Sequence, residues 1–173
     1  MIIFLLIFEL LILLTVGSFL IFFCVLPLFT GAPYVKSKKE KVEIMMRLAD
    51  LKPNDLMIDL GSGDGLFVIE AARRGAKAIG YEINPILVWW SKRKIKSLRQ
   101  AERAKIYRKS FWSVDLSSAT CVMLYGITGM MKKLEKKLEN ELKPGTKIIS
   151  NGFSFPDWKP KIKENGVYFY IKK

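Results

Sequence analysis

The 173-residue sequence contains no histidine and only two cysteines, Cys24 and Cys121. Histidine is the usual proton donor or acceptor near neutral pH and the commonest zinc ligand, so its absence argues against histidine catalysis and a typical zinc site. The two cysteines lie in separate apolar stretches, and we expect both to be reduced. We therefore predict neither a metal site nor a disulfide framework.

The first 35 residues also lack any lysine or arginine, and Glu9 is their single charged residue. Leu10 to Phe29 are twenty consecutive uncharged positions. At about 1.5 Å per residue, a helix of that length spans a hydrocarbon layer of roughly 30 Å. No basic segment precedes this run and no small-x-small cleavage site precedes Gly31, which favours an uncleaved anchor over a signal peptide. We expect residues 1–30 to form a transmembrane anchor with Glu9 near its outer end.

All 29 basic residues and 15 of the 16 acidic residues follow this segment, which makes the remainder strongly basic. Four lysines come directly after the expected span: Lys36, Lys38, Lys39 and Lys41. The positive-inside rule then places residues 31–173 in the cytoplasm or on the equivalent side of an organelle membrane. The alternative is that these lysines form only a solvated linker.

Residues 31–173 show alternating strand and helix patterns. Strands are expected at Leu56–Leu60, Ala78–Tyr81, Lys105–Arg108, Cys121–Tyr125 and Lys147–Asn151. Helices are expected at about Val42–Leu51, Leu66–Arg74 with Gly75 as its left-handed cap, Asn84–Gln100 and Met130–Leu142. Two further strands, Trp158–Lys163 and Val167–Ile171, flank Asn165-Gly166, a pair typical of a type I′ hairpin turn. This order predicts an α/β fold with a mostly parallel, Rossmann-like sheet, right-handed crossovers and an antiparallel C-terminal hairpin.

The stretch "DLGSGDG", Asp59–Gly65, follows the first expected strand and contains three glycines at alternate positions. Glycines so spaced indicate a loop that needs positive φ or the close approach of another molecule. The loop departs from the dinucleotide motif G-x-G-x-x-G because Leu66 takes the third glycine position, and no lysine follows as in a P-loop. Ligands of such sheets bind beyond the carboxyl ends of the strands, where this loop is expected.

The pattern D-x-G-x-G-x-G resembles the loop of class I S-adenosylmethionine-dependent methyltransferases. The resemblance implies that the cofactor S-adenosylmethionine contacts the loop residues Asp59, Leu60, Gly61, Ser62, Gly63, Asp64 and Gly65. It also implies that Glu82, at the end of the second strand, accepts hydrogen bonds from both ribose hydroxyls. Asp59 and Asp64 would be favourable beside the cationic groups of the cofactor. The alternative is a glycine-rich turn that caps a helix in another doubly wound protein.

Longer segments, including "GAPYVKS", "GYEINP", "MMKKLEKKLENELKPGTKIIS" and "FSFPDWKP", resemble the small protein-lysine methyltransferases. These comprise archaeal soluble forms and mitochondrial membrane-anchored forms that methylate the ADP/ATP carrier and the ATP synthase c subunit. The resemblance implies methyl transfer to a lysine of a protein, in the mitochondrial inner membrane if the source is eukaryotic. The sequence departs from the family at Lys36 and Ser37, and at Ser110, where the family has an acid or Asn facing adenine. Ser110 or the Phe111 backbone is expected to contact adenine instead.

The same resemblance indicates candidates for an acceptor channel: Tyr34, Tyr125, Asn151, Phe153, Phe155 and Trp158. Desolvation between aromatic rings lowers the pKa of a lysine, and ring faces attract methylammonium. The alternative is that Phe153, Phe155 and Trp158 only pack the edge of the sheet. Three other functions stay open: RNA methylation, because of the basic stretch "SKRKIKSLRQAERAK", methylation of a lipid or quinone at the membrane, and a catalytically silent cofactor binder.

Overall fold

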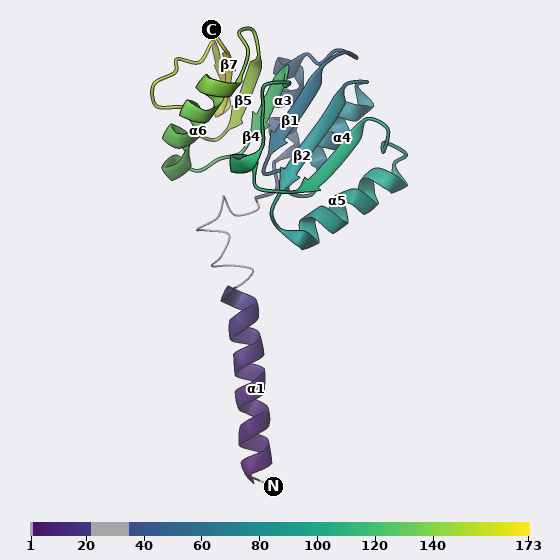
Figure 1. Ribbon diagram of the computed structural model, residues 1–173, viewed down its shortest axis with the longest axis vertical. Coiled ribbons are helices and arrows are strands. Elements are labelled where there is room, and N and C mark those ends of the chain that lie inside the picture. The colour runs from purple at the N-terminus through teal and green to yellow at the C-terminus, as the bar shows by residue number, and fades with distance from the viewer. Residues whose placement is uncertain (1, 22–34) are drawn as a thin grey trace. The chain divides into compact units, whose positions relative to one another are not determined.

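The structure is a computed structural model that describes residues 2–21 and 35–173 (Figure 1). The chain divides into two compact units, Met1–Tyr34 and Val35–Lys173. In the first unit, helix α1 (Ile2–Leu20) is long and apolar enough to cross a membrane and buries none of its residues. It begins earlier than the predicted span, so Glu9 lies within the helix rather than at its end. Predicted span residues 22–29, Cys24 and Tyr34 lie outside the described residues.

The second unit alternates strands and helices as predicted. In order, its elements are α3 (Lys39–Ala49), β1 (Leu56–Leu60), α4 (Leu66–Arg73), β2 (Lys77–Glu82), α5 (Pro85–Ser97), β3 (Ala104–Arg108), the 3₁₀ helix η2 (Phe111–Ser113), β4 (Cys121–Leu124), α6 (Thr128–Glu141), β5 (Lys147–Asn151), β6 (Ile162–Glu164) and β7 (Val167–Ile171). The strands form one sheet of order β3-β2-β1-β4-β5-β7-β6. The first five are parallel and β7 is antiparallel to both its neighbours, which confirms the predicted fold class.

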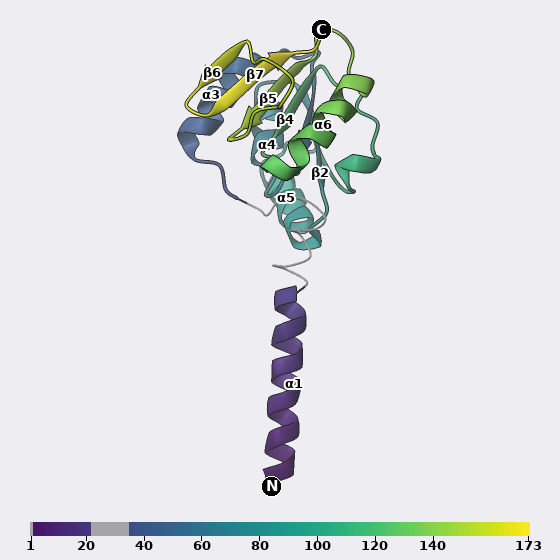
Figure 2. The same ribbon diagram turned by 90° about the vertical axis from the view of Figure 1, so that its left-hand side faces the viewer.

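Helices cover both faces of this sheet, as Figure 2 shows for α3 and α6. Side chains alternate between the faces along each strand. Met57 of β1 belongs to a core with residues of α3, α4 and α5, whereas Ile58 belongs to a second core with residues of α6 and η2. Burial on both faces explains why β4 is an uninterrupted apolar run in the sequence and why Asp59 is the single polar residue of β1.

The C-terminal hairpin has the predicted turn, because Asn165 (φ 43°) and Gly166 (φ 69°) both adopt left-handed backbone conformations. Strand β6 begins at Ile162 and not at Trp158 as predicted. The physical reason is that the Trp158 amide donates to the Glu135 carboxylate (2.7 Å) and Pro160 has no amide hydrogen for a ladder.

Two predicted helices also end earlier than expected. Helix α3 stops at Ala49 because Asp50 takes a left-handed conformation (φ 40°). Helix α5 stops at Ser97, and Arg99 is likewise left-handed (φ 56°), so the predicted extension to Gln100 is wrong. In both places a non-glycine residue ends the helix, which the sequence does not signal.

Strand β1 lies between β2 and β4 and so marks the point where the strand order reverses. In doubly wound sheets a crevice opens at this point beyond the carboxyl ends of the strands. The loop after β1, the end of β2 and the segments after β3, β4 and β5 therefore meet at one edge of the sheet. This edge carries the candidate functional site.

Candidate functional site

The loop between β1 and α4 has the backbone that its glycines predict. Gly61 (φ 85°), Gly63 (φ 53°) and Gly65 (φ 76°) are all left-handed. The Gly61 and Ser62 amides both donate to the Tyr81 carbonyl of β2, at 2.9 and 3.0 Å, so the loop is attached to the neighbouring strand. A Cβ atom on Gly61 would meet nothing within 4 Å, which leaves the space beside the loop open for a ligand.

Glu82, the last residue of β2, connects this loop to the start of α5. Its Oε2 accepts from the Gly63 amide (2.9 Å) and its Oε1 from the Asn84 amide (2.8 Å). A carboxylate has about four acceptor positions, so about two stay available for the hydroxyls of a ligand. The Asn84 side chain in turn caps α5 by accepting from the Ile86 and Leu87 amides, as the Asn84-Pro85 pair predicts. Loop, carboxylate and helix thus hold one another in place.

Asp59 stands at the base of the loop with only 3% of its surface exposed. Within the described residues, Asp59 Oδ2 and Ser62 Oγ are buried without a hydrogen-bond partner. Burial, reinforced by the nearby Glu82 and Asp64 carboxylates, raises the pKa of Asp59 to about 8. The sequence predicts a negatively charged Asp59. With a pKa of about 8, however, the carboxyl is mostly protonated at neutral pH unless a cationic group binds beside it. Unpaired buried polar atoms are costly, and a polar or cationic ligand group at this position would satisfy them.

Asp64 differs from its sequence-based interpretation because it already has a cationic partner. Its Oδ2 lies 3.2 Å from Lys94 Nζ of α5, and both side chains are partly buried. Its Oδ1 accepts from the Leu66 amide at 3.3 Å, at the start of α4. Asp64 therefore positions the loop against α4 and α5. Thirty residues separate Asp64 from Lys94, and no sequence pattern indicates the pair.

Ser110 and Phe111 follow β3 at the same edge. The Lys109 amide donates to the Glu82 carbonyl (3.1 Å), which places the start of this segment beside the end of β2. Ser110 Oγ caps η2 by accepting from the Trp112 amide (3.4 Å), and its hydroxyl hydrogen stays available as a donor. Phe111 is buried with its ring centroid 4.8 Å from that of Trp112. This arrangement offers an apolar wall and one hydroxyl beside Glu82.

Three of the candidate channel residues come together after β4 and β5. Tyr125 follows β4, and its ring centroid lies 6.3 Å from that of Phe153. Gly152 (φ 80°) lets the chain turn under Tyr125, since a Cβ there would lie 3.1 Å from Tyr125 Cε2. Asn151 ends β5, is buried, and donates from Nδ2 to Ser37 Oγ at 3.5 Å. Tyr125, Asn151 and Phe153 thus share the end of neighbouring strands.

Phe155 and Trp158 belong to the same hydrophobic cluster as Phe153, where they make packing contacts of their own. Phe155 is 3% exposed, and its amide donates to the Tyr170 hydroxyl (3.1 Å) while its ring packs 5.1 Å from those of Trp158 and Tyr170. Glu135 of α6 accepts from the Trp158 amide, and burial raises the pKa of the Glu135 carboxyl. These contacts favour the packing alternative for Phe155 and Trp158.

The comparison with known proteins agrees with this geometry. The model of the ANTKMT methyltransferase domain family matches residues 59–162, which begin at the base of the glycine loop. The chain belongs to this methyltransferase family. The resemblance predicted from the sequence is therefore confirmed.

Curated relatives of this methyltransferase have related names. A lysine N-methyltransferase of Mus musculus, named for the ATP synthase c subunit, is 40% identical over 128 residues, covering 74% of this chain and 51% of the relative. A protein-lysine N-methyltransferase of Saccharolobus islandicus is 38% identical over 149 residues, covering 80% of this chain and 92% of the relative. The chain thus spans about half the length of the former relative and nearly all of the latter.

Solved structures show the same fold. A structure described as an RNA methyltransferase from Salinibacter ruber, in complex with S-adenosyl-L-homocysteine, has a TM-score of 0.76 and 36% identity, covering 79% of this chain and 93% of that one. A C-terminal domain of precorrin-6Y C5,15-methyltransferase from Rhodobacter capsulatus, at 19% identity and a TM-score of 0.61, shares the fold. The Rossmann-like methyltransferase architecture is therefore well supported.

Three residues that pack within the candidate site were missed at the sequence level, in addition to Lys94. Gly80 of β2 leaves room for Ser62, because a Cβ there would lie 2.5 Å from Ser62 Oγ. Ser91 of α5 packs against Gly65, where a Cβ would lie 2.9 Å from Ser91 Cβ. Gly152 directly follows a predicted strand, and the sequence could have indicated a turn there. Gly80 and Ser91 lie inside a strand and a helix, where no sequence pattern indicates their contacts with the loop.

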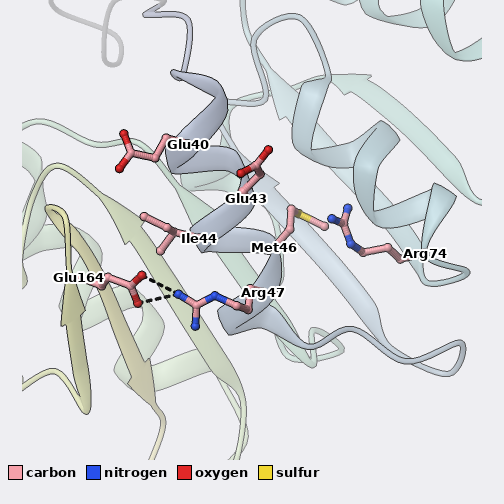
Figure 3. Close-up of a pocket in the computed structure, with 7 residues that line it drawn as sticks. All are labelled: Glu40, Glu43, Ile44, Met46, Arg47, Arg74 and Glu164. Carbon is pink, nitrogen blue, oxygen red and sulfur yellow. Dashed lines mark hydrogen bonds and ion pairs between the residues drawn. The ribbon is translucent and has the colours of Figure 1, made fainter.

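A second concavity lies along α3 (Figure 3). It is lined by Glu40, Glu43, Ile44, Met46, Arg47, Arg74 and Glu164. The Arg47 guanidinium pairs with the Glu164 carboxylate at 2.6 Å, and both side chains are largely exposed. None of the predicted cofactor residues lines it, and we assign it no function.

Proposed function

We propose that this protein is a membrane-anchored protein-lysine N-methyltransferase. The observation that carries the proposal is the buried Asp59 carboxyl at the base of the left-handed glycine loop, with Glu82 across the loop from it. This arrangement fits a ligand that carries both cationic groups and vicinal hydroxyls. The archaeal relative that matches over most of its length is named a protein-lysine N-methyltransferase.

S-adenosylmethionine is the cofactor. When bound, it supplies an electrophilic methyl group on a positively charged sulfur. The loop Asp59–Gly65 would hold the methionine half of the cofactor, and Asp59 would bind the ammonium group of that half. Glu82 would accept hydrogen bonds from the ribose hydroxyls. Ser110 and Phe111, beside Glu82, would contact adenine with one hydroxyl and one apolar wall. The open space beside Gly61 allows the loop backbone to approach the cofactor closely.

The chain must also bring a neutral lysine amine to this edge of the sheet. Tyr125 and Phe153, with ring centroids 6.3 Å apart, would desolvate the amine and lower its pKa. Asn151 is buried beside them and would orient the amine through its side-chain carbonyl. The charged lysine loses its proton to solvent before transfer, so no histidine or other dedicated base is needed. Alignment of the amine with the methyl carbon then supplies most of the rate acceleration.

Cys121, the one cysteine among the described residues, is not placed to act as a nucleophile. Cys121 is fully buried, and burial raises the pKa of its thiol to about 12, which makes it unreactive. Within the described ranges, no group of three His, Cys, Asp or Glu side chains could hold a metal ion. Direct displacement by a lysine amine requires neither.

The membrane anchor and topology belong to the same proposal. Helix α1 is one candidate span, and its exposed apolar surface would be covered by lipid. The positive-inside rule then indicates that the catalytic unit is cytoplasmic, because four lysines follow the span: Lys36, Lys38, Lys39 and Lys41. In a eukaryote, the membrane would be the inner mitochondrial membrane. Alkaline carbonate extraction of native membranes tests this part: recovery of the protein in the supernatant would contradict an integral anchor.

The enzymatic proposal is tested by incubating the purified full chain with radiolabelled S-adenosylmethionine and native membranes. We expect label in protein, mapped by mass spectrometry to a lysine side chain. At a cofactor concentration below saturation, Glu82→Gln should strongly reduce the label, whereas Arg47→Gln, which alters an exposed ion pair in the second concavity, should preserve it. Label confined to lipid or to RNA would overturn the proposal.

RNA methylation is the second candidate. It is favoured by the description of the Salinibacter ruber structure and by a net charge of +13. Basic surfaces bind phosphates in a salt-dependent manner without reading sequence. The labelling experiment includes total RNA as a second acceptor, and transfer to RNA in preference to protein would establish this alternative.

A further inference from the structure

The outward face of α5 exposes large apolar side chains. Ile86, Trp89 and Trp90 are 50%, 56% and 59% exposed, respectively. Ile86 precedes Trp89 by three positions and Trp90 by four, which places all three on one side of a helix. Val88, Ser91 and Ile95 are buried on the opposite side. Two adjacent exposed tryptophans with an isoleucine form a patch that a soluble surface rarely shows, and such patches mark interaction sites.

Cations surround this patch. Lys92 and Lys96 are exposed beside it, and the Arg93 guanidinium lies 5.0 Å from the centre of the Trp89 ring. Lys94 is paired with Asp64, but within residues 35–173 no salt bridge involves Lys92, Arg93 or Lys96. Helix α5 contains no acidic residue. Its outward face therefore combines apolar bulk with unneutralised positive charge.

The patch lies near the candidate site. Helix α5 packs on β2 and β3 at the margin of the unit (Figure 1). Its first residue follows Glu82 by three positions, and the Asn84 amide donates to the Glu82 carboxylate. The N-terminal turns of α5, which carry Ile86 and Trp89, therefore lie at the same edge of the sheet as the glycine loop. A surface bound to this face would lie close to the opening of the site.

We propose that the outward face of α5 docks the catalytic unit on an anionic lipid bilayer. Ile86, Trp89 and Trp90 enter the headgroup region, where tryptophan is favoured because its ring is apolar and its N–H is polar. Lys92, Arg93 and Lys96 lie against lipid phosphates, to which basic residues near a membrane are attracted. A helix with tryptophan on one side and flanking cations is typical of membrane-surface segments.

A bilayer fits this face better than RNA does. Base stacking would use the tryptophan rings but not the exposed Ile86, whereas all three side chains gain from entering an apolar layer. The proposal goes beyond the function proposed above, because a spanning helix attaches the chain to a membrane without orienting its catalytic unit. Docking through α5 would turn the glycine loop edge toward the surface from which the lysine of a membrane protein is presented.

The test uses the full chain reconstituted in vesicles whose acyl chains are brominated near the headgroups, since bromine quenches nearby tryptophan. Two of the four tryptophans lie on α5, so about half of the emission should be quenched in anionic vesicles and less in zwitterionic ones. The variant Lys92→Gln/Arg93→Gln/Lys96→Gln, which keeps every tryptophan, should lose most of this quenching. A matched control replaces three exposed cations elsewhere with glutamine: Lys132, Lys136 and Lys159. It should be quenched like the unaltered chain.

A second variant, Trp89→Phe/Trp90→Phe, identifies the quenched residues, and circular dichroism verifies that it is folded. Retention of quenching in this variant would overturn the proposal, as would equal loss in both charge variants. Salt-dependent binding of a labelled single-stranded RNA that is lost only in the α5 charge variant, without lipid quenching, would also overturn it and assign the face to nucleic acid. Methylation of a lysine peptide in detergent is measured separately, so failure of docking and failure of the proposed enzyme activity are distinguishable.

Discussion

Replacement of Asp59 by asparagine should change how the stability of the protein depends on pH. The folded protein raises the pKa of Asp59 to about 8 from an ordinary value of 3.8. It therefore holds this proton more tightly than the unfolded chain does. Below about pH 4 both states are protonated and Asp59 costs nothing; above that pH, the unfolded chain ionises first and stability falls by about 1.4 kcal/mol per pH unit until pH 8. At pH 7 the accumulated loss is about 4 kcal/mol.

Asparagine has a similar shape and does not titrate, so Asp59→Asn should lack this component. Urea unfolding of the full chain in detergent, followed by circular dichroism between about pH 5 and pH 8, measures it. The free energy of unfolding of the variant minus that of the unaltered protein should increase steadily over this range. A difference that stays constant from pH 5 to pH 8 would refute the burial argument, whatever its absolute size.

Cofactor binding should release the same proton from Asp59 into solution. A cationic ligand group beside Asp59 favours the carboxylate, so binding at pH 7 should release up to about one proton per cofactor. Titration calorimetry in buffers of different ionisation enthalpy measures this number. The amine of the ligand titrates equally with both proteins, so the difference between the unaltered chain and Asp59→Asn reports Asp59 alone. Equal proton release by both proteins would contradict a direct role for Asp59.

Three further predictions concern the same edge of the sheet. Glu82→Gln should weaken cofactor binding about 10- to 100-fold in calorimetry, because hydrogen bonds to a charged acceptor are lost; unchanged affinity would exclude Glu82 as the ribose ligand. Gly61→Ala and Gly145→Ala should each lower the free energy of unfolding by about 1 kcal/mol, since both positions have positive φ and open space. Only Gly61→Ala should abolish methyl transfer, and equal methyl transfer by the two variants would show that the cofactor does not approach the loop. Gly80→Ala should lower the melting temperature more than either, because its Cβ would overlap Ser62 Oγ, and an unchanged melting temperature would contradict that packing.

Most of the architecture could be predicted from local sequence. Strands β1, β5 and β7 have the predicted bounds because each contains adjacent apolar residues and lies between turn or loop residues. The glycines of Asp59–Gly65 and the Asn165-Gly166 turn were predictable because positive φ is easy for glycine and tolerable for asparagine. Glu82 could be placed since a strand of known end brings its last residue to the carboxyl edge.

Other features depend on contacts between residues far apart in the chain. The late start of β6 follows from Glu135, which binds the Trp158 amide across 23 positions. The packing of Phe155 against Tyr170 favours a role in the core for Phe155, yet an aromatic residue of either role looks the same in sequence. The outward direction of Trp89 and Trp90 was likewise invisible, because the helical pattern of α5 does not show which side faces the sheet.

The sequence by itself determined the order of elements, the left-handed loop and the apolar helix near the N-terminus, because each depends on neighbouring residues and on backbone sterics. Only the tertiary structure decided that Asp59 is buried without a partner for Oδ2, that Lys94 neutralises Asp64 and that α5 turns its tryptophans outward. Burial and charge pairing arise when distant segments exclude water together, and no single segment carries that information.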